Sequence, residues 1–180
     1  MTESAQPPAP GIPPEVHADL DAWGKLVNEL SADYHRESDR AAVVLAISRL
    51  DFELGEALKT LFVDDPLVAK KFDHGMFQHF GGRIDLAFCL GFLSKPLFDD
   101  MHALRKLRNR FAHHHRHADL SDAEARAILS RMRATSQILK HAAKDFRNAC
   151  FVAVASALFV VRLNIRTKAR PVVPQDAFWP

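Results

Sequence analysis

Apolar residues recur every three or four positions along most of the chain, which is the spacing of one face of an α-helix. Alternation of the kind found in strands never extends beyond a few residues, and no internal repeat is present. The predicted helices cover residues 14–34, 39–62, 66–72, 83–93, 96–113, 122–134 and 137–168. The pattern therefore predicts an all-α chain.

Residues with short polar side chains precede three of these stretches, and such residues cap helix N-termini. The predicted caps are Ser38, Asp65 and Ser121. Pro66 then takes the first helical position of its helix, and Glu124 completes a capping box with Ser121. Residues 73–82 contain three glycines and are predicted to form a loop.

The helices are predicted to form one domain, because 180 residues suffice for a single complete core. Short loops favour antiparallel neighbours, and so an up-and-down helical bundle over residues 14–168. Residues 1–13 are rich in proline and small residues and are predicted to be a disordered arm. Residues 169–180 contain three prolines and are predicted to be an extended tail.

Signals for export and for a membrane span are not found in the sequence. The N-terminus has an early acidic residue, no basic start and no apolar core, unlike a signal peptide. The longest apolar run, Ala149 to Val161, has thirteen residues and is predicted to be a core helix, being too short to cross a bilayer. These features predict a cytoplasmic protein that does not bind membranes.

Charge is distributed unevenly along the chain, although the net charge is only +2. Residues 1–100 carry 17 acidic and 9 basic side chains, whereas residues 101–170 carry 15 basic and 4 acidic ones. The basic half either faces a polyanion or pairs with the acidic half, within the bundle or across a dimer. Both interpretations stay open at this point.

The most informative segment is the helix that ends near His113, which carries the cassette of residues 108–113. At 100° per residue, Arg105, Asn109 and His113 stack along one face, and Arg108 lies at the border between core and solvent. Its long side chain can bury its stem and deliver the guanidinium to the polar face. Arg108, Asn109 and His113 are therefore candidates for one site. The opposite, core-facing side is formed by Leu104, Leu107 and Phe111.

The same helix and the segment after it form a local positive patch, because no acidic residue occurs from Met101 to Ala118. We expect this patch to contact nucleic acid weakly or to bind a protein partner. The candidate binding residues are Arg105, Lys106, Arg108, Arg110 and Arg116.

The cassette resembles the Arg-Asn-x-x-x-His signature of HEPN domains, which are helical bundles. A closer resemblance, to the mannitol operon repressor (MltR-like) family, covers about residues 38–165. It is carried by the string RIDLA at residues 83–87 and the string LRKLRNRFAH at residues 104–113. The resemblance implies a HEPN-like bundle from a cytoplasmic bacterial protein, a homodimer, and negative regulation of transcription. No helix-turn-helix pattern is found, which favours action through a protein partner.

HEPN domains of the nuclease type imply a second function, that of a metal-independent endoribonuclease. By this resemblance His113 would be the general acid–base, Arg108 would clamp the phosphate and Asn109 would orient one of them. A noncatalytic alternative pairs Arg108 with a carboxylate of the second helix. The candidate partners are Asp51, Glu53 and Glu56. We favour this alternative, and with it a noncatalytic regulatory or interaction protein.

Potential metal and thiol chemistry gives weaker signals. The histidines at 113, 114, 115 and 117 lack a nearby cysteine or carboxylate to complete a four-coordinate site, so we expect no metal and no cofactor. Cys89 and Cys150 lie in apolar stretches and are predicted to be buried thiols. Gly55 lies inside the second helix, where it weakens the helix but permits close packing.

Overall fold

The computed structural model describes residues 14–113, 119–133 and 146–167, and within these ranges it contains helices but no strand. The helices are α1 (Pro14–Arg36), α2 (Asp39–Lys59), α3 (Pro66–Asp73), α4 (Phe80–Cys89), α5 (Lys95–His113), α6 (Ala123–Ser130) and α8 (Phe146–Thr167). The all-α prediction is thus confirmed for the described part of the chain. The predicted arm, the predicted tail and the start of the last predicted helix lie outside these ranges.

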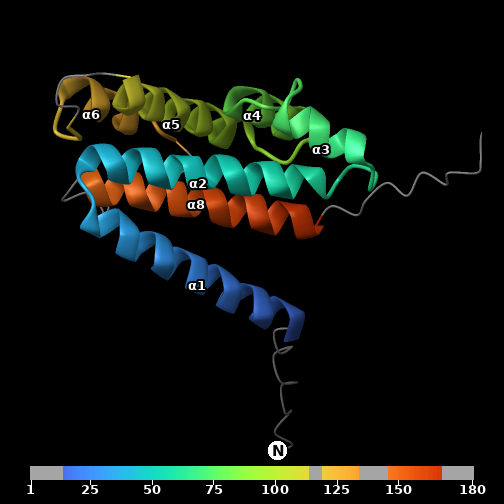
Figure 1. Ribbon diagram of the computed structural model, residues 1–180. Helices are drawn as coiled ribbons and strands as arrows, with labels where there is room; N and C mark the ends of the chain where they lie inside the picture. The colour runs from blue at the N-terminus through green and yellow to red at the C-terminus, as the bar shows by residue number, and fades with distance from the viewer. Residues whose placement is uncertain (1–13, 114–118, 134–145, 168–180) are drawn as a thin grey trace, which may run out of the picture.

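The helices form layers around a central pair (Figure 1). α2 packs against α8, and α5 lies with α4 across one face of this pair. α6 and α3 lie at the two ends of that layer. α1 lies on the opposite side and diverges from the central pair toward its own N-terminus.

The central pair is parallel, which the predicted up-and-down arrangement does not include. Arg147 at the start of α8 pairs with Asp39 at the start of α2, at 2.7 Å. Arg162 near the end of α8 approaches Glu53 of α2 at 3.3 Å. The sequential neighbours α1 and α2, by contrast, run in opposite directions (Figure 1). Short loops determine the direction of sequential neighbours, but α2 and α8 are separated by the whole α3–α6 layer.

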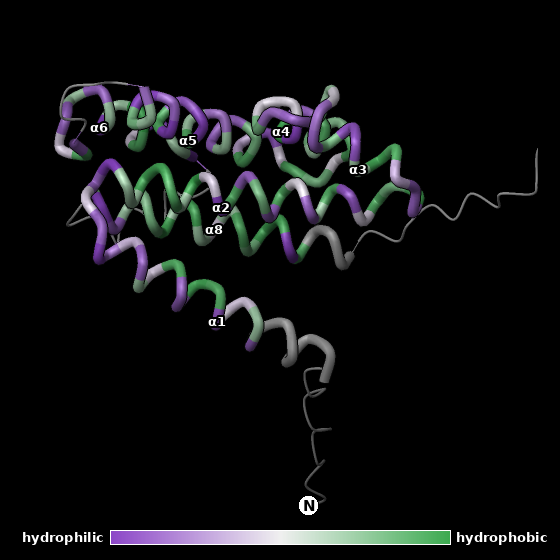
Figure 2. Tube along the Cα trace, in the orientation of Figure 1, coloured by the Kyte–Doolittle hydropathy of each residue, from purple (hydrophilic) through white to green (hydrophobic). Residues whose placement is uncertain are grey.

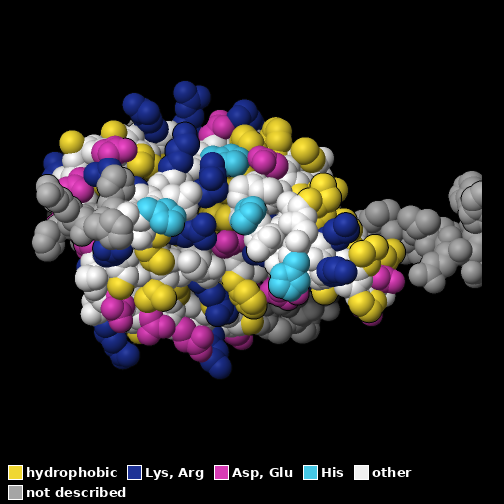
Figure 3. Space-filling view, turned by 45° about the horizontal axis from the view of Figure 1, so that its top comes forward, with side chains coloured by type: hydrophobic (Ala, Val, Ile, Leu, Met, Phe, Trp, Pro, Cys, Tyr) yellow, Lys and Arg dark blue, Asp and Glu magenta, His cyan; other side chains and the backbone are white. Residues whose placement is uncertain are grey.

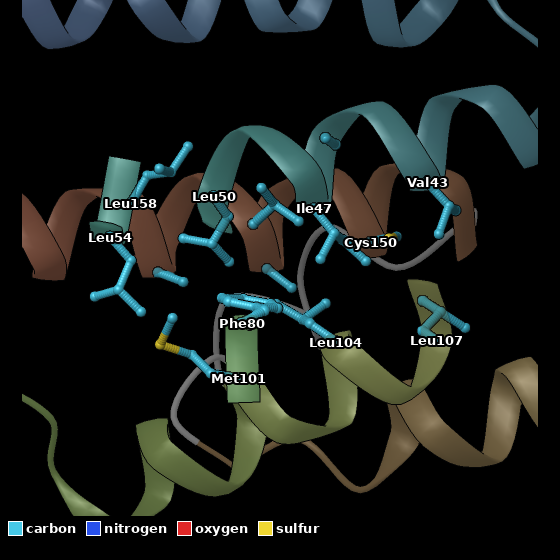
Figure 4. Packing of buried hydrophobic residues seen from close by; sticks show 14 of the residues in the cluster. Val43, Ile47, Leu50, Leu54, Phe80, Met101, Leu104, Leu107, Cys150 and Leu158 are labelled. Atoms are coloured by element: carbon cyan, nitrogen blue, oxygen red, sulfur yellow. The ribbon is translucent and has the colours of Figure 1, made fainter. Parts of the chain in front are cut away.

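One hydrophobic core lies between the central pair and the α4–α5 layer. In Figure 2, hydrophobic and hydrophilic positions alternate turn by turn along α1, α2 and α5, as expected of amphipathic helices. Each fully buried Leu, Ile or Phe contributes about 1.5–3 kcal/mol relative to an exposed one. The side chains labelled in Figure 4 meet in this core: Val43, Ile47, Leu50, Leu54, Phe80, Met101, Leu104, Leu107, Cys150 and Leu158.

Helix α8 combines high hydropathy with the burial pattern of a core helix. Its 18-residue segment Phe146–Leu163 has a mean hydropathy of 1.6 and is long and apolar enough to cross a membrane, so the sequence count of thirteen residues was too low. Buried positions nevertheless recur in helical register at Ala153, Ala157 and Val161, and the helix packs against α2. Helix α8 thus packs one face against the rest of the bundle.

Two predicted N-caps are confirmed. The Ser38 side chain accepts a hydrogen bond from the backbone N–H of Ala41 at the start of α2. Asp65 caps α3 by accepting the N–H of Leu67 at 2.7 Å, and Pro66 takes the first position of that helix.

The boundaries of α4 differ from the prediction of a loop to residue 82 and a helix over residues 83–93. The helix begins at Phe80, so Gly81 and Gly82 lie in its first turn. It ends early because Gly91 adopts a φ of 69°, which closes the helix with two backbone hydrogen bonds of 2.8 Å. The chain then turns inward to bury Phe92.

The predicted capping box at Ser121 is wrong. α6 begins at Ala123 with Asp122 as its N-cap residue, and no side-chain hydrogen bond caps it. The carboxylates of Asp122 and Glu124 are instead paired with Arg110 of α5. α6 also ends at Ser130 rather than at residue 134.

Tyr34, Arg147 and Cys150 join α1, α2 and α8 at one end of the bundle. The Tyr34 hydroxyl donates to the Arg147 carbonyl at 3.0 Å, and the Arg147 guanidinium donates to the carbonyls of Tyr34 and Glu37 and to Asp39. Cys150 is buried there as predicted, because it faces the core. Cys89 is exposed, which corrects the prediction that both thiols are buried.

Candidate functional site

The cassette helix α5 has the predicted core face. Leu104, Leu107 and Phe111 have no exposed surface. Arg108 and Asn109 are partly buried, whereas His113 is exposed in the last turn. The helical spacing therefore placed the apolar and polar faces of this helix correctly.

Arg108 is held by a carboxylate of α2, as the noncatalytic alternative predicts. Its Nη1 lies 3.3 Å from Oδ2 of Asp51, and the two side chains are 26% and 16% exposed. The other two candidate partners are occupied elsewhere: Glu53 pairs with Arg49 and Arg162, and Glu56 pairs with Lys59. Asp51 is thus the partner among the three carboxylates.

Asp51 also binds a second arginine, which sequence reasoning missed. Nη1 of Arg83, in α4, lies 2.8 Å from Oδ1 of Asp51. Arg83 also donates from Nε to the carbonyl of Phe77 and from Nη2 to the carbonyl of Phe72. One carboxylate therefore joins α2, α4 and α5 through two guanidinium groups. The only signal for this in the sequence was Arg83 at the head of the RIDLA string.

Gly55 provides the space for this arrangement. A β-carbon at this position would lie 3.0 Å from Nη1 of Arg83, closer than ordinary van der Waals contact. The sequence predicted close helix packing at Gly55, and the group that approaches this glycine is the Arg83 side chain. Burial raises the pKa of Asp51, and the positive charges of Arg83 and Arg108 oppose that rise.

Asn109 contacts Arg108, whereas no contact of the described residues links His113 to either of them. Oδ1 of Asn109 accepts a hydrogen bond of 3.4 Å from Nη2 of Arg108. The Arg108 guanidinium also lies 5.8 Å from the centre of the Phe80 ring, at cation–π distance. Among the contacts of the described residues, none joins His113 to Arg108 or to Asn109. The structure thus brings together two of the three candidate catalytic residues.

The predicted positive patch is partly neutralised. Arg110 pairs with Asp122 and Glu124 of the neighbouring helix α6. Arg105 packs against Gly81, and within the described ranges its buried Nε has no hydrogen-bond partner. Lys106 is exposed. Arg116 lies outside the described residues.

Figure 3 shows the face that α3 to α6 form. Lysine, arginine and histidine side chains are spread over its middle, with acidic side chains among them. The described residues of this face are thus mixed in charge, and among them no uninterrupted positive stripe of the kind expected of an electrostatic nucleic-acid site is seen.

Three histidines outside the cassette are surface or hydrogen-bonded residues. His74 and His79 are exposed, and Nε2 of His102 lies 3.1 Å from a carboxylate oxygen of Asp85. Within the described ranges no three His, Cys, Asp or Glu side chains are grouped closely enough to hold a metal ion. The histidines at 114, 115 and 117 fall outside those ranges.

No family model matches this chain, and no curated protein or solved structure is found to be similar to it. The resemblance to the mannitol operon repressor family therefore rests on the two sequence strings, of which RIDLA supplies Arg83 and LRKLRNRFAH supplies Arg108. Both arginines bind the same carboxylate of Asp51.

Proposed function

We propose that the protein is a noncatalytic regulator of transcription, in which the cassette arginine is part of the scaffold. The observation that supports this most directly is the contact of Arg108 with Asp51 inside the bundle. We further propose that it works in the bacterial cytoplasm as a homodimer and acts through a protein partner.

The hydrogen-bond partners of Arg108 explain why a structural role is favoured over a phosphate clamp. A guanidinium that clamps a phosphate offers two free N–H groups in a fork. In Arg108, Nη1 binds Asp51 and Nη2 binds Asn109. Both terminal nitrogens of Arg108 thus already have partners, and the negative charge of Asp51 offsets the positive charge that a phosphate clamp would use.

The position of His113 supports the same conclusion. A general acid–base acts within hydrogen-bond reach of the reacting group, and is commonly oriented by a further residue. His113 lies exposed in the last turn of α5, and no described contact orients its ring toward Arg108. The mixed charge of the surrounding face also favours a protein partner over nucleic acid as the ligand (Figure 3).

The test compares RNA cleavage and stability in Arg108→Ala protein. We expect no cleavage by the wild type in the presence of a chelator. We expect the variant to lose about 1.5–3 kcal/mol, the range for hydrogen bonds to charged groups. That loss corresponds to about 2–4 °C in Tm for each kcal/mol in a chain of this size. The matched control is Lys106→Ala, an exposed neighbour on the same helix, which should stay within about 0.5 kcal/mol of the wild type.

The contrary result is a defined reaction. RNA cleaved in the presence of a chelator, with 2′,3′-cyclic phosphate ends and no cleavage of the matching DNA, would establish the endoribonuclease. The activity would also have to disappear in His113→Ala protein of unchanged Tm. An unaltered Tm in Arg108→Ala would separately refute the structural role of the arginine.

A further inference from the structure

A groove runs between α1 and α2, on the side of the bundle away from the cassette. It has a volume of about 370 Å³. Its apolar part is formed by both helices, and in Figure 1 α1 diverges from the central pair as it leaves the groove. The apolar lining residues are Leu26, Leu30, Ala42, Leu45 and Ala46.

One wall of the groove carries a row of carboxylates. Glu29 and Asp33 are spaced four residues apart on α1 and so lie on one face of that helix, and Glu37 follows directly after its last residue. Within the described part of the chain none of the three forms an ion pair. Like charges at this spacing repel one another and destabilise an isolated helix. A ligand with positive charges would relieve that repulsion.

The basic residues of the groove do not cancel this row. Arg49, on the α2 wall, pairs with Glu53 of its own helix at 2.7 Å. Arg36 lines the groove from α1 but forms no ion pair with a described residue. Among the described residues that line the groove, three carboxylates and the Arg36 guanidinium form no ion pair, so the lining has a net negative charge.

Helix α2 carries two exposed apolar side chains, one lining the groove and one beyond it. Leu45 is 50% exposed and Phe52 is 53% exposed, although both are large hydrophobic residues. They are seven residues apart and so lie on the same face, as two turns of a helix require. Arg49 lies between them on this face, with its guanidinium 5.6 Å from the centre of the Phe52 ring. Exposed apolar side chains bordered by charges are typical of a protein-binding site.

We propose that this groove binds a basic amphipathic helix of the protein partner. The apolar side of that helix packs on Leu45 and Phe52, and its lysines or arginines face Glu29, Asp33 and Glu37, which is the helix-in-groove mode of recognition. The inference rests on the proposed function, in which the protein acts through a partner. A second copy fits less well, because a two-fold axis through the groove brings the carboxylate row toward its own copy.

The probe is a fluorescent synthetic peptide of about 15–20 residues, long enough to form a helix on binding. It carries leucine on one face and lysine on the other, and a matched peptide carries glutamate in place of lysine. Fluorescence anisotropy should show that the full chain binds the lysine peptide at least tenfold more tightly. Glu29→Lys with Asp33→Lys should weaken that binding tenfold or more, and so should Leu45→Asp.

The matched control changes the same charge elsewhere. Asp64→Lys with Asp99→Lys alters two exposed carboxylates outside the groove and should leave binding within twofold of the wild type. Equal weakening in this control would mean that overall charge, and not the groove, attracts the peptide, and would overturn the proposal. Absence of binding to the wild type would overturn it as well.

Light scattering on the same variants tests whether a second copy of the chain, and not a partner's helix, occupies the groove. A dimer that becomes a monomer in Leu45→Asp would assign the groove to a second copy and refute the helix of a partner. RNA cleavage by the wild type would refute the proposed noncatalytic function. The peptide measurements would still decide whether the groove binds a basic helix. Failure of peptide binding in a protein that does not cleave RNA would refute the groove alone.

Discussion

At the scale of single residues, two buried groups that can lose a proton, the Tyr34 hydroxyl and the Cys150 thiol, lie where α1 meets α8. Burial raises the pKa of the Cys150 thiol to about 12, and it raises the pKa of the Tyr34 hydroxyl well above its usual range. An ordinary thiol has a pKa of about 8.5. Below that pH neither the folded nor the unfolded chain ionises Cys150. Above it, the unfolded chain releases the proton and the folded chain retains it, so alkali favours unfolding.

We therefore expect the free energy of unfolding to fall between about pH 8.5 and pH 11, with Cys150 contributing up to about 1.4 kcal/mol for each pH unit. Cys150→Ala removes this titration, so its stability should decline less steeply with pH, although the variant starts lower because a small cavity forms. Urea unfolding curves across this pH range measure the difference.

The exposed cysteine supplies the control for that experiment. Cys89→Ala should retain the wild-type dependence on pH, because Cys89 is exposed in the folded chain. Parallel pH profiles for the wild type and Cys150→Ala would contradict the prediction.

Residue-level sequence reasoning correctly limited the partner of Arg108 to three carboxylates of α2, but it could not choose among them. Which carboxylate faces α5 depends on how far α2 is rotated about its axis in the bundle, and core packing determines that rotation. Arg83 was missed for a related reason. It is brought to Asp51 by the packing of α4 against α2, which no local pattern in the sequence encodes.

At the scale of the element, α4 shows how two adjacent glycines differ. A β-carbon on Gly82 would lie 2.9 Å from the carbonyl oxygen of Met76, whereas one on Gly81 would make ordinary contact with Arg105 at 3.6 Å. The sequence suggested only that both glycines interrupt a helix. Whether a glycine interrupts a helix or lets another segment approach it depends on that segment, here the turn at Met76.

Alanine substitutions separate the two glycines. Gly81→Ala should leave stability unchanged or raise it by up to about 1 kcal/mol, the helix-propensity gain over glycine. Gly82→Ala receives the same gain but must displace a backbone carbonyl, so we expect a net loss of stability. Thermal unfolding of the two variants measures the contrast. Equal Tm values would show that the turn at Met76 yields without cost.

At the scale of the whole molecule, part of the charge asymmetry is used internally. In the described part of the chain, ion pairs join the basic half to the acidic half, among them Arg108 to Asp51, Arg147 to Asp39, and Arg162 to Glu53. Of the two interpretations left open by the sequence, pairing within the bundle thus accounts for these three cations. The helix stripes predicted the all-α class and most helix positions, but the parallel central pair required knowledge of contacts about 110 residues apart along the chain.

Arg147 is the residue of α8 that binds both α1 and α2. Its guanidinium binds Asp39 and the carbonyls of Tyr34 and Glu37, so it joins three helices. We expect Arg147→Ala to lower the free energy of unfolding by about 2–4 kcal/mol, because partly buried acceptors lose a charged donor. Arg162→Ala, whose side chain is 38% exposed and has one acceptor, should cost about 1 kcal/mol or less. Urea unfolding measures both, and equal losses would contradict the ranking.

The pairing of α2 with α8 has a consequence for synthesis on the ribosome. α2 ends at Lys59 and its main partner begins at Phe146, so the apolar face of α2 emerges long before α8 exists. At an elongation rate of about 5–20 residues per second, several seconds pass before α8 has been synthesised and can cover that face. The α4–α5 layer can cover part of it in the interval, since both helices also contact α2. Until residue 167 has left the exit tunnel, the nascent chain remains a natural client for chaperones that bind exposed apolar helices.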